Sequence, residues 1–86
     1  NPNEIDEVVK EYSPVIERSA TIGIDDEFLG QKIKTFLKLK NKKISINLLH
    51  KYLAKKLGHL KKPDEIVIIK KFPTTSTGKV IKRFLK

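Results

Sequence analysis

The chain has 86 residues, of which 38% are apolar, and it carries a formal net charge of +9. This length holds one small domain with a thin core and excludes a second domain. The absence of Cys excludes disulfides, thiolate zinc sites and thiol nucleophiles. No apolar run reaches the roughly 20 residues that span a bilayer, and no signal-peptide pattern opens the chain. We therefore expect a soluble, cytoplasmic domain and, because the chain starts at Asn1 and contains no Met, a piece of a longer protein.

Charge is divided unevenly along the chain. Residues 1–29 have a net charge of −6, and residues 30–86 have a net charge of +15. A strongly basic part indicates an anionic partner, which could be a phosphate-bearing small molecule, a nucleic acid or an acidic protein surface. From composition alone, a solvated lysine surface without a partner is an equally good interpretation.

The first part of the chain predicts a helix and then a strand. Asn3 can cap a helix that ends before Pro14, because apolar residues recur there at helical spacing: Ile5, Val8, Val9 and Tyr12. Residues 15–24 are rich in β-branched side chains and predict a strand that ends at an acidic turn. One face of this strand would carry Ala20, Ile22 and Ile24, and the turn would consist of Asp25, Asp26 and Glu27.

A second strand and a second helix follow. After Gly30, a period of two predicts a strand whose lysine face is interrupted by Phe36. Ser45 is a good N-cap for a helix that ends at Gly58. The apolar stripe of this helix consists of Leu49, Tyr52, Leu53 and Leu57.

The last third predicts a strand, a loop and a terminal turn. The continuous apolar run at residues 66–69 is typical of a strand buried on both faces, so we expect it at the centre of the sheet. Residues 73–78 predict an exposed loop, and residues 80–85 a basic helical turn that packs back on the domain. The expected fold is α+β, a small sheet of about three strands covered by helices.

The loop Thr75-Ser76-Thr77-Gly78-Lys79 is the candidate functional site. Hydroxyls and backbone amides can hold phosphate or carboxylate oxygens, Gly78 can adopt a positive φ, and Lys79 brings a mobile positive charge. The phosphate-binding loop of nucleotide hydrolases is excluded, because it needs an earlier glycine and a Ser or Thr after the lysine. On these residues alone, a polar turn with an ordinary surface lysine remains the simpler interpretation.

The longer string Pro73-x-Thr75-x-x-Gly78-Lys79-x-x-x-Arg83 resembles the final signature motif of the adenylate-forming (AMP-forming) ligase superfamily. This superfamily contains acyl-CoA synthetases, adenylation domains of peptide synthetases and luciferases. Other segments resemble its small C-terminal domain in the same order along the chain: residues 2–8, 14–17, 21–31, 34–40, 53–58, 61–63 and 65–67. The resemblance covers essentially all 86 residues.

The resemblance implies a two-step reaction in a longer enzyme. A large N-terminal domain would bind ATP, Mg²⁺ and a carboxylic acid, and Lys79 would stabilise charge as the acid attacks ATP and pyrophosphate leaves. The small domain would then rotate so that coenzyme A attacks the acyl-adenylate. Thr75, Ser76, Thr77 and Gly78 would shape the loop that Pro73 opens, and Arg83 would dock against the large domain or anchor the loop.

The same resemblance implies what this chain lacks. The hinge and the motifs for ATP, metal and acid would precede the chain, so we expect these residues alone to catalyse nothing and to bind no metal or cofactor. Within the family, the loop looks more like that of acyl-CoA synthetases, and a fatty-acid–CoA ligase is expected.

Three alternatives stay open. A small basic nucleic-acid-binding module would need exposed aromatic residues, for which Phe72 and Phe84 beside the loop are candidates, whereas Phe28 and Tyr52 are expected in the core. The other two alternatives are an adenylation domain of a peptide synthetase and a regulatory protein that acts alone.

His50, His59 and the acidic turn do not have the spacing of metal ligands.

Overall fold

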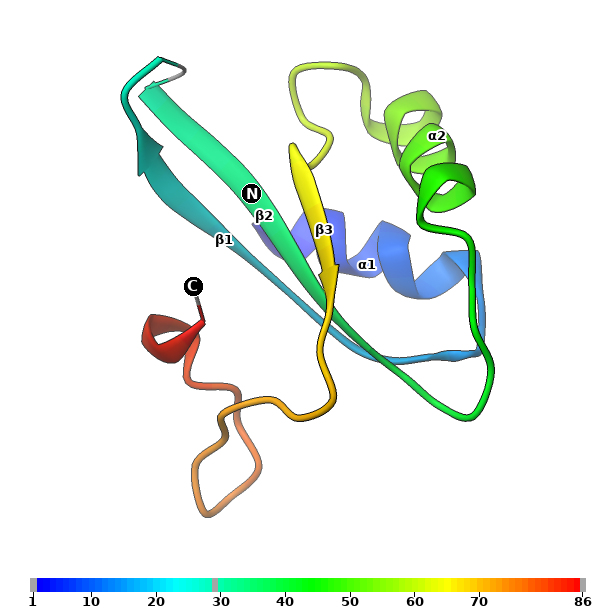
Figure 1. The fold of residues 1–86 in the computed structure, drawn as a ribbon, viewed down its shortest axis with the longest axis vertical. Coiled ribbons are helices and arrows are strands. Elements are labelled where there is room, and N and C mark those ends of the chain that lie inside the picture. The colour runs from blue at the N-terminus through cyan, green and yellow to red at the C-terminus, as the bar shows by residue number, and fades with distance from the viewer. Residues whose placement is uncertain (1, 29, 86) are drawn as a thin grey trace.

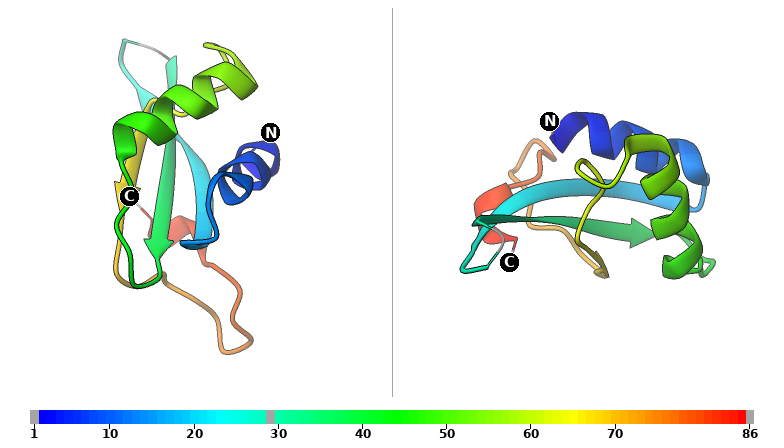
Figure 2. Two further views of the ribbon diagram at one scale, coloured as in Figure 1. Left: turned by 90° about the vertical axis from the view of Figure 1, so that its right-hand side faces the viewer. Right: turned by 90° about the horizontal axis from the view of Figure 1, so that it is seen from above.

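The structure, a computed structural model, describes residues 2–28 and 30–85 (Figure 1). Its elements in chain order are α1 (Pro2–Tyr12), β1 (Ile16–Asp26), β2 (Gly30–Leu39), α2 (Ile46–Leu57), β3 (Glu65–Ile68) and the short 3-10 helix η1 (Lys82–Phe84). The strands form one sheet in the order β1-β2-β3, in which β2 is antiparallel to β1 and parallel to β3. Both helices cover one face of the sheet, and the C-terminal segment packs against the other (Figure 2). The expected α+β fold is confirmed.

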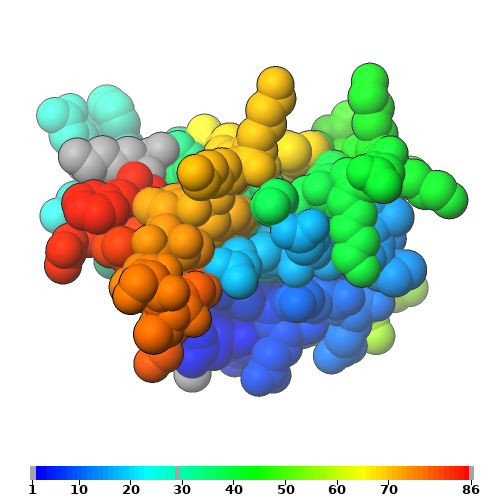
Figure 3. Space-filling model, turned by 90° about the horizontal axis from the view of Figure 1, so that it is seen from below, coloured from blue at the N-terminus to red at the C-terminus, as the bar shows by residue number. Residues whose placement is uncertain are grey.

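The C-terminal segment leaves β3 and forms a hairpin at the end of the domain opposite the turn between β1 and β2 (Figure 1). Seen from that end, the hairpin shares one surface with residues 40–43 and 70–71 (Figure 3). Segments that are far apart in the sequence therefore meet at the end of the molecule that carries the candidate site.

Strand β2 is buried on both faces. On the helix side, Leu37 lies in one cluster with Leu49 and Leu53 of α2, and all three side chains are 0% exposed. On the other side, Phe36 is 3% exposed and lies in a second cluster with Phe72. Because consecutive side chains of a strand point to opposite faces, residues 36 and 37 belong to two separate cores. The interruption of the lysine face by Phe36 marks the second core.

Strand β1 contains a bulge at Glu17. Ile16 and Arg18 pair with consecutive residues of β2, which leaves Glu17 without a partner on that strand. An extra residue of this kind reverses the alternation of side chains between the two faces. Ile16 therefore lies in the helix-side core, while Ala20, four residues later, lies in the core on the other face.

The carboxylate of Asp6 joins α1 to the outer edge of β1. It accepts hydrogen bonds from the Ser19 hydroxyl at 2.6 Å, the Thr21 hydroxyl at 2.8 Å and the Thr21 N–H at 3.2 Å. The Thr21 hydroxyl also lies 2.8 Å from that of Thr35, and both threonines are buried. The ammonium group of Lys82 donates to the Thr21 carbonyl at 3.0 Å. Side chains thus satisfy both backbone groups of Thr21 and cover this stretch of a free sheet edge.

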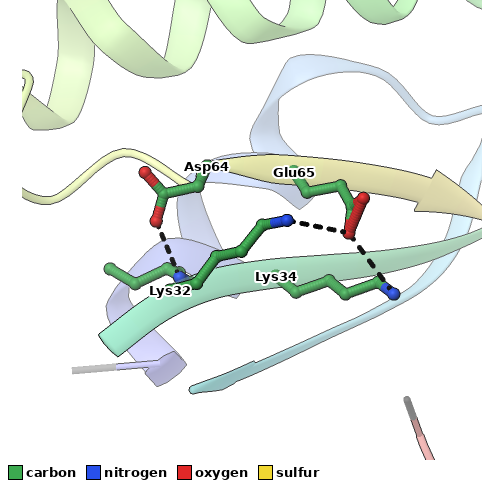
Figure 4. A network of polar contacts seen from close by, with 5 residues as sticks. Lys32, Lys34, Asp64 and Glu65 are labelled. Carbon is green, nitrogen blue, oxygen red and sulfur yellow. Dashed lines mark hydrogen bonds and ion pairs between the residues drawn. The ribbon is translucent and has the colours of Figure 1, made fainter. Parts of the chain in front are cut away.

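Polar contacts hold the start of β3 against β2 (Figure 4). Asp64 accepts a hydrogen bond from the Ile33 N–H at 2.8 Å, and its own N–H donates to the Ile33 carbonyl at 2.8 Å. Glu65 forms ion pairs with Lys34 at 3.3 Å and Lys32 at 3.8 Å. These contacts help to set the register of a parallel pair, which no short turn can connect.

The prediction that residues 66–69 form the central strand is wrong, because β3 lies at the edge of the sheet and β2 at its centre. Ile68 is 45% exposed. The apolar run arises because Ile66 packs beside the helix-side core, whereas Val67 and Ile69 pack beside the other core. A continuous apolar run reports contacts on both faces of a strand, but it does not report the strand's place in the sheet.

The helix boundaries agree in part with the sequence. Helix α1 begins at Pro2, so the prediction of Asn3 as its cap is wrong. Proline suits the first helical position, because its φ is fixed near the helical value and no N–H is needed there. For α2, the predicted N-cap is confirmed, since the Ser45 hydroxyl accepts from the Leu48 N–H at 3.2 Å. Its predicted end is also confirmed, with Gly58 at φ 84°.

The acidic turn is shorter than predicted. Asp25 and Asp26 still pair with Gln31 and Gly30 of β2, so β1 extends to Asp26. Backbone pairing needs no apolar side chains, and the hairpin therefore continues beyond the core. Phe28 lies at this turn and is 90% exposed, which makes its predicted place in the core wrong.

Replacing Asp6 with alanine should destabilise the fold, because the buried Thr21 N–H and hydroxyl lose their acceptor. We expect the Asp6→Ala substitution to lower the free energy of unfolding by about 1–3 kcal/mol. The control Asp25→Ala removes an exposed carboxylate and should change it by less than about 0.5 kcal/mol. Urea denaturation measures both. Equal effects of the two substitutions would show that Asp6 does not hold the helix to the sheet edge.

Candidate functional site

The predicted exposed loop is a hairpin closed by backbone pairing. Thr74 and Val80 form an antiparallel bridge at its base. Further out, the Thr75 N–H donates to the Lys79 carbonyl at 2.8 Å. Residues 74–79 are all exposed, as the sequence predicts. The loop is thus exposed and yet has a defined backbone.

Thr75 organises the tip of the hairpin. Its carbonyl accepts the Gly78 N–H at 2.9 Å, and its hydroxyl accepts the Lys79 N–H at 3.1 Å and lies 3.0 Å from the Thr77 hydroxyl. Gly78 has φ 89°, as the final residue of a three-residue loop that also contains Ser76 and Thr77. Residues other than glycine rarely adopt this backbone conformation. The prediction that Gly78 can adopt a positive φ is therefore confirmed.

Fewer backbone N–H groups of the loop are available to bind an anion than the sequence predicts. The N–H groups of Thr75, Gly78 and Lys79 donate within the hairpin, so they are not available as an amide cradle for phosphate. Lys79 is exposed and, within residues 2–28 and 30–85, its side chain forms no ion pair. The charged group that this loop can deliver to a partner is therefore the Lys79 ammonium.

The base of the hairpin is fixed to the sheet by apolar anchors. Phe72 is 4% exposed and Leu85 is 6% exposed, and both lie in the second core. Between them, the Pro73 carbonyl accepts the Ile81 N–H at 2.8 Å. The prediction that Phe72 is exposed beside the loop is wrong, because the ring fills the space over Phe36. Packing of the last residues on the domain is confirmed through Leu85.

The basic side chain that binds the loop is Arg18. Its Nη1 donates to the Gly78 carbonyl at 3.2 Å, across 60 positions of sequence. Arg83, for which loop anchoring was one of two expected roles, lies instead with its guanidinium carbon 5.0 Å from the centre of the Phe84 ring. Arg18 is outside the signature motif, and no spacing in the sequence connects it with Gly78.

A shallow hollow of about 260 Å³ lies beside the loop, and its charged lining comes from Glu17, Arg18, Lys38 and Lys71. Lys38 lies 3.0 Å from the carboxylate of Glu17. The hydrogen bond from Lys38 lowers the pKa of the Glu17 carboxyl, and the positive charges of Lys38, Lys40 and Arg18 act in the same direction. The acid in this hollow is therefore already paired.

The end of the domain around the loop is strongly basic. A second hollow of about 440 Å³ lies between residues 38–43 and 68–70, and five lysines line it: Lys38, Lys40, Lys42, Lys43 and Lys70. Side chains of both segments project into solvent on the surface that carries the hairpin (Figure 3). Part of the positive charge of the later part of the chain thus lies at the end of the domain that carries Lys79.

The histidines lie elsewhere. His50 is half-buried on α2, and His59 is exposed just after it. Across the described part of the chain, no three His, Asp or Glu residues gather in a group that could hold a metal ion. In the same residues, no helix is long and apolar enough to cross a membrane.

The ion pair between Glu17 and Lys38 predicts how the Glu17 carboxyl titrates. The carboxyl should titrate below the ordinary range for glutamate, and Lys38→Gln should raise its pKa, as NMR of the side-chain carboxyl carbon would show. Because the folded-state pKa is lowered, the pair stabilises the fold above the unfolded-state pKa and loses this effect as the pH falls through the folded-state pKa. An unchanged Glu17 pKa in Lys38→Gln would contradict this assignment.

Comparisons with known proteins agree with this architecture. A family model described as the AMP-binding enzyme C-terminal domain matches residues 4–79. The human protein named acetyl-coenzyme A synthetase 2-like, mitochondrial, is 29% identical over 87 residues, which cover 96% of this chain and 12% of that protein. The long-chain-fatty-acid–CoA ligase of Salmonella typhimurium is 28% identical over 85 residues, which cover 99% of this chain and 15% of the ligase.

Among solved structures, a fatty acyl CoA synthetase of Mycobacterium tuberculosis has a TM-score of 0.88 and 26% identity, and the match covers 98% of this chain and 16% of that one. The chain therefore spans between 12% and 16% of the length of these proteins. The match over residues 4–79, together with the shared fold, shows that the chain belongs to the family of C-terminal domains of AMP-binding, adenylate-forming enzymes.

Proposed function

We propose that this chain is the mobile C-terminal domain of an AMP-forming acyl-CoA synthetase and that Lys79 acts in the first of two half-reactions. In that step a carboxylate oxygen of the acid forms a bond to the α-phosphorus of ATP, and the bond from this phosphorus to pyrophosphate breaks. Negative charge is concentrated around the phosphorus as this happens, and a fixed ammonium group stabilises it without transferring a proton. The observation that carries the proposal is the exposed, internally hydrogen-bonded hairpin that ends in Lys79.

The other motif residues shape and place this hairpin. Thr75 accepts and donates the hydrogen bonds that close it, and Gly78 supplies the positive φ of its last position. Ser76 and Thr77 form the exposed tip. Pro73 connects the buried Phe72 to the start of the hairpin. For Arg83, which lies outside the hairpin on η1, we propose contact with the large domain.

The partner of this surface is a large N-terminal domain of the same polypeptide. The chain corresponds to 12–16% of its relatives, so the sites for ATP, the acid and Mg²⁺ are assigned to that domain. No cluster of metal ligands exists among the described residues, and no step of the reaction here is assigned to a metal on this chain. The basic end around Lys79 suits a neighbour that holds a polyanion such as ATP.

In the second half-reaction, the thiol sulfur of coenzyme A bonds to the acyl carbon, the thiol proton is lost and AMP leaves. Lys79 is assigned to the first step alone, so the end of the domain that carries it has no role assigned in the second. We therefore propose that the domain rotates between the two steps, as lid domains do in other multistep enzymes.

The acid that we propose is a fatty acid. A long-chain ligase and a fatty acyl CoA synthetase are among the proteins that match along almost the whole domain, at 28% and 26% identity, beside the acetyl-coenzyme A synthetase 2-like protein at 29%. ATP and coenzyme A are both intracellular substrates, and we accordingly propose a cytoplasmic location. A nucleic-acid-binding module is not favoured, because the family model matches residues 4–79 and, of the two aromatic candidates beside the loop, Phe72 is buried and Phe84 alone is exposed.

Replacing Lys79 with alanine in the complete enzyme should stop the first half-reaction selectively. We expect the rate of adenylate formation, measured by pyrophosphate release, to fall about 10²- to 10³-fold, the usual loss when one stabilising group is removed. Thioester formation from supplied acyl-adenylate should continue. The control Lys55→Ala removes an exposed lysine of α2, outside the basic end around the loop, and should leave both rates unchanged. Normal adenylate formation by the Lys79→Ala enzyme would refute the assignment.

The choice of acid has its own test. With acetate, hexanoate, palmitate and benzoate as substrates of the complete enzyme, pyrophosphate release should give the highest kcat/KM for a fatty acid. If acetate or benzoate is used best, the fatty-acid assignment fails, while the role of Lys79 is unaffected.

A further inference from the structure

We propose that Arg18 is a positioning residue for Lys79: its guanidinium fixes the peptide group from which the lysine extends. This inference rests on the proposed function of the loop. It assigns a role in the adenylation step to a residue of β1 that lies outside the signature motif and contacts no reacting atom.

The peptide group between Gly78 and Lys79 is held at both ends. Its oxygen, the Gly78 carbonyl, accepts the hydrogen bond from Arg18 at 3.2 Å. Its nitrogen, the Lys79 N–H, donates to the Thr75 hydroxyl at 3.1 Å. The Thr75 bond lies within the hairpin and sets its shape, whereas the Arg18 bond connects the hairpin with the sheet. Arg18 thus controls how the finished hairpin is oriented relative to the domain.

The other contacts that hold the hairpin act at its base. Phe72 and Leu85 are buried in the second core before and after it. From Thr75 to Lys79 the chain is exposed, and the Arg18 bond is the contact found there between the described sheet and the loop. An exposed segment anchored only at its base can swing, and a misplacement of about 1 Å can cost 10²-fold in rate.

The bulge in β1 puts Arg18 in place for this role. Because Glu17 is unpaired on β2, Ile16 enters the helix-side core while Arg18 lies on the face of Ala20, against which the C-terminal segment packs. If Glu17 were instead paired regularly between them, Ile16 and Arg18 would lie on the same face. The bulge thus allows a core side chain and a loop-binding side chain to stand two positions apart.

Local charge also favours the bond. The Glu17 carboxylate, which could compete for the guanidinium, lies 3.0 Å from Lys38 and is engaged by it. A guanidinium has several donors in a rigid plane and makes charge-assisted hydrogen bonds to oxygen. The carbonyl of Gly78 is the acceptor that the fold offers it.

The test uses the complete enzyme with Arg18→Gln, which removes the charge and shortens the side chain. We expect kcat of adenylate formation to fall about tenfold, which corresponds to about 1.4 kcal/mol of barrier height. The KM values for ATP and acid, thioester formation from supplied acyl-adenylate and the melting temperature should stay unchanged. Arg18→Lys keeps a long cationic donor and should recover most of the rate.

Two further variants separate positioning from general effects. Lys71→Gln removes a positive charge that lines the same hollow, so a loss of rate caused by charge alone should appear there as well, and it should be smaller than the loss in Arg18→Gln. In a Lys79→Ala background, Arg18→Gln should cause no further loss, because a residue that acts through Lys79 has no effect once the lysine is gone.

Several results would overturn the inference. These are an unchanged rate in Arg18→Gln, an equal loss in both half-reactions, a loss as large in Lys71→Gln, or additive losses in the double variant. In each of these cases the loss in Lys79→Ala alone would still support the proposed function. If Lys79→Ala itself adenylates normally, the proposed function fails and the inference fails with it.

Discussion

The double-sided burial of β2 is the constraint on which the other parts of the structure depend. The strand has ten residues and must bury apolar groups on both faces, although three of its side chains are lysines. The helix face meets this demand with Ile33, Leu37 and Leu39, and with the buried Thr35, whose hydroxyl is hydrogen-bonded to Thr21. The other face has Phe36 as its main apolar group, and Lys34 lies 5.0 Å from this ring while pairing with Glu65. The Lys34 ammonium thus lies over the Phe36 ring as a cation–π contact while it remains paired with Glu65.

This asymmetry explains how the candidate site is attached. The second core has four buried members, Ala20, Phe36, Phe72 and Leu85, whereas the helix-side core has more. A core of this size can hold the two ends of the C-terminal segment but not the hairpin between them. Polar bonds to β1 supplement it, one from Lys82 to the Thr21 carbonyl and one from Arg18 to the Gly78 carbonyl. The loop is therefore exposed at its tip because little apolar surface lies beneath it.

The sequence correctly predicts features that depend on neighbouring residues. It does not predict features that depend on contacts between segments far apart in the chain. Ser45 and Gly58 bound α2 as predicted, because a cap and a positive φ depend on neighbouring residues. The same holds for Gly78 in the candidate site. The edge position of β3 depends on which strand pairs with which, and the burial of Phe72 depends on its contact with Phe36. Arg18 could not be found, because its bond to the loop spans 60 positions and requires the bulge at Glu17.

The bulge makes a one-residue insertion more serious than a substitution in this part of β1. Glu17 is exposed, and its side chain makes a surface ion pair, so many residue types can replace it. Ile16 and Arg18 already pair with consecutive residues of β2, so deleting Glu17 would leave them on the opposite faces that they occupy now. Inserting a further residue would instead turn Ile16 away from the helices or rotate the rest of the strand, including Arg18, to the wrong face. Related chains are therefore expected to vary freely in residue type at this position and to lose this residue more readily than they gain another.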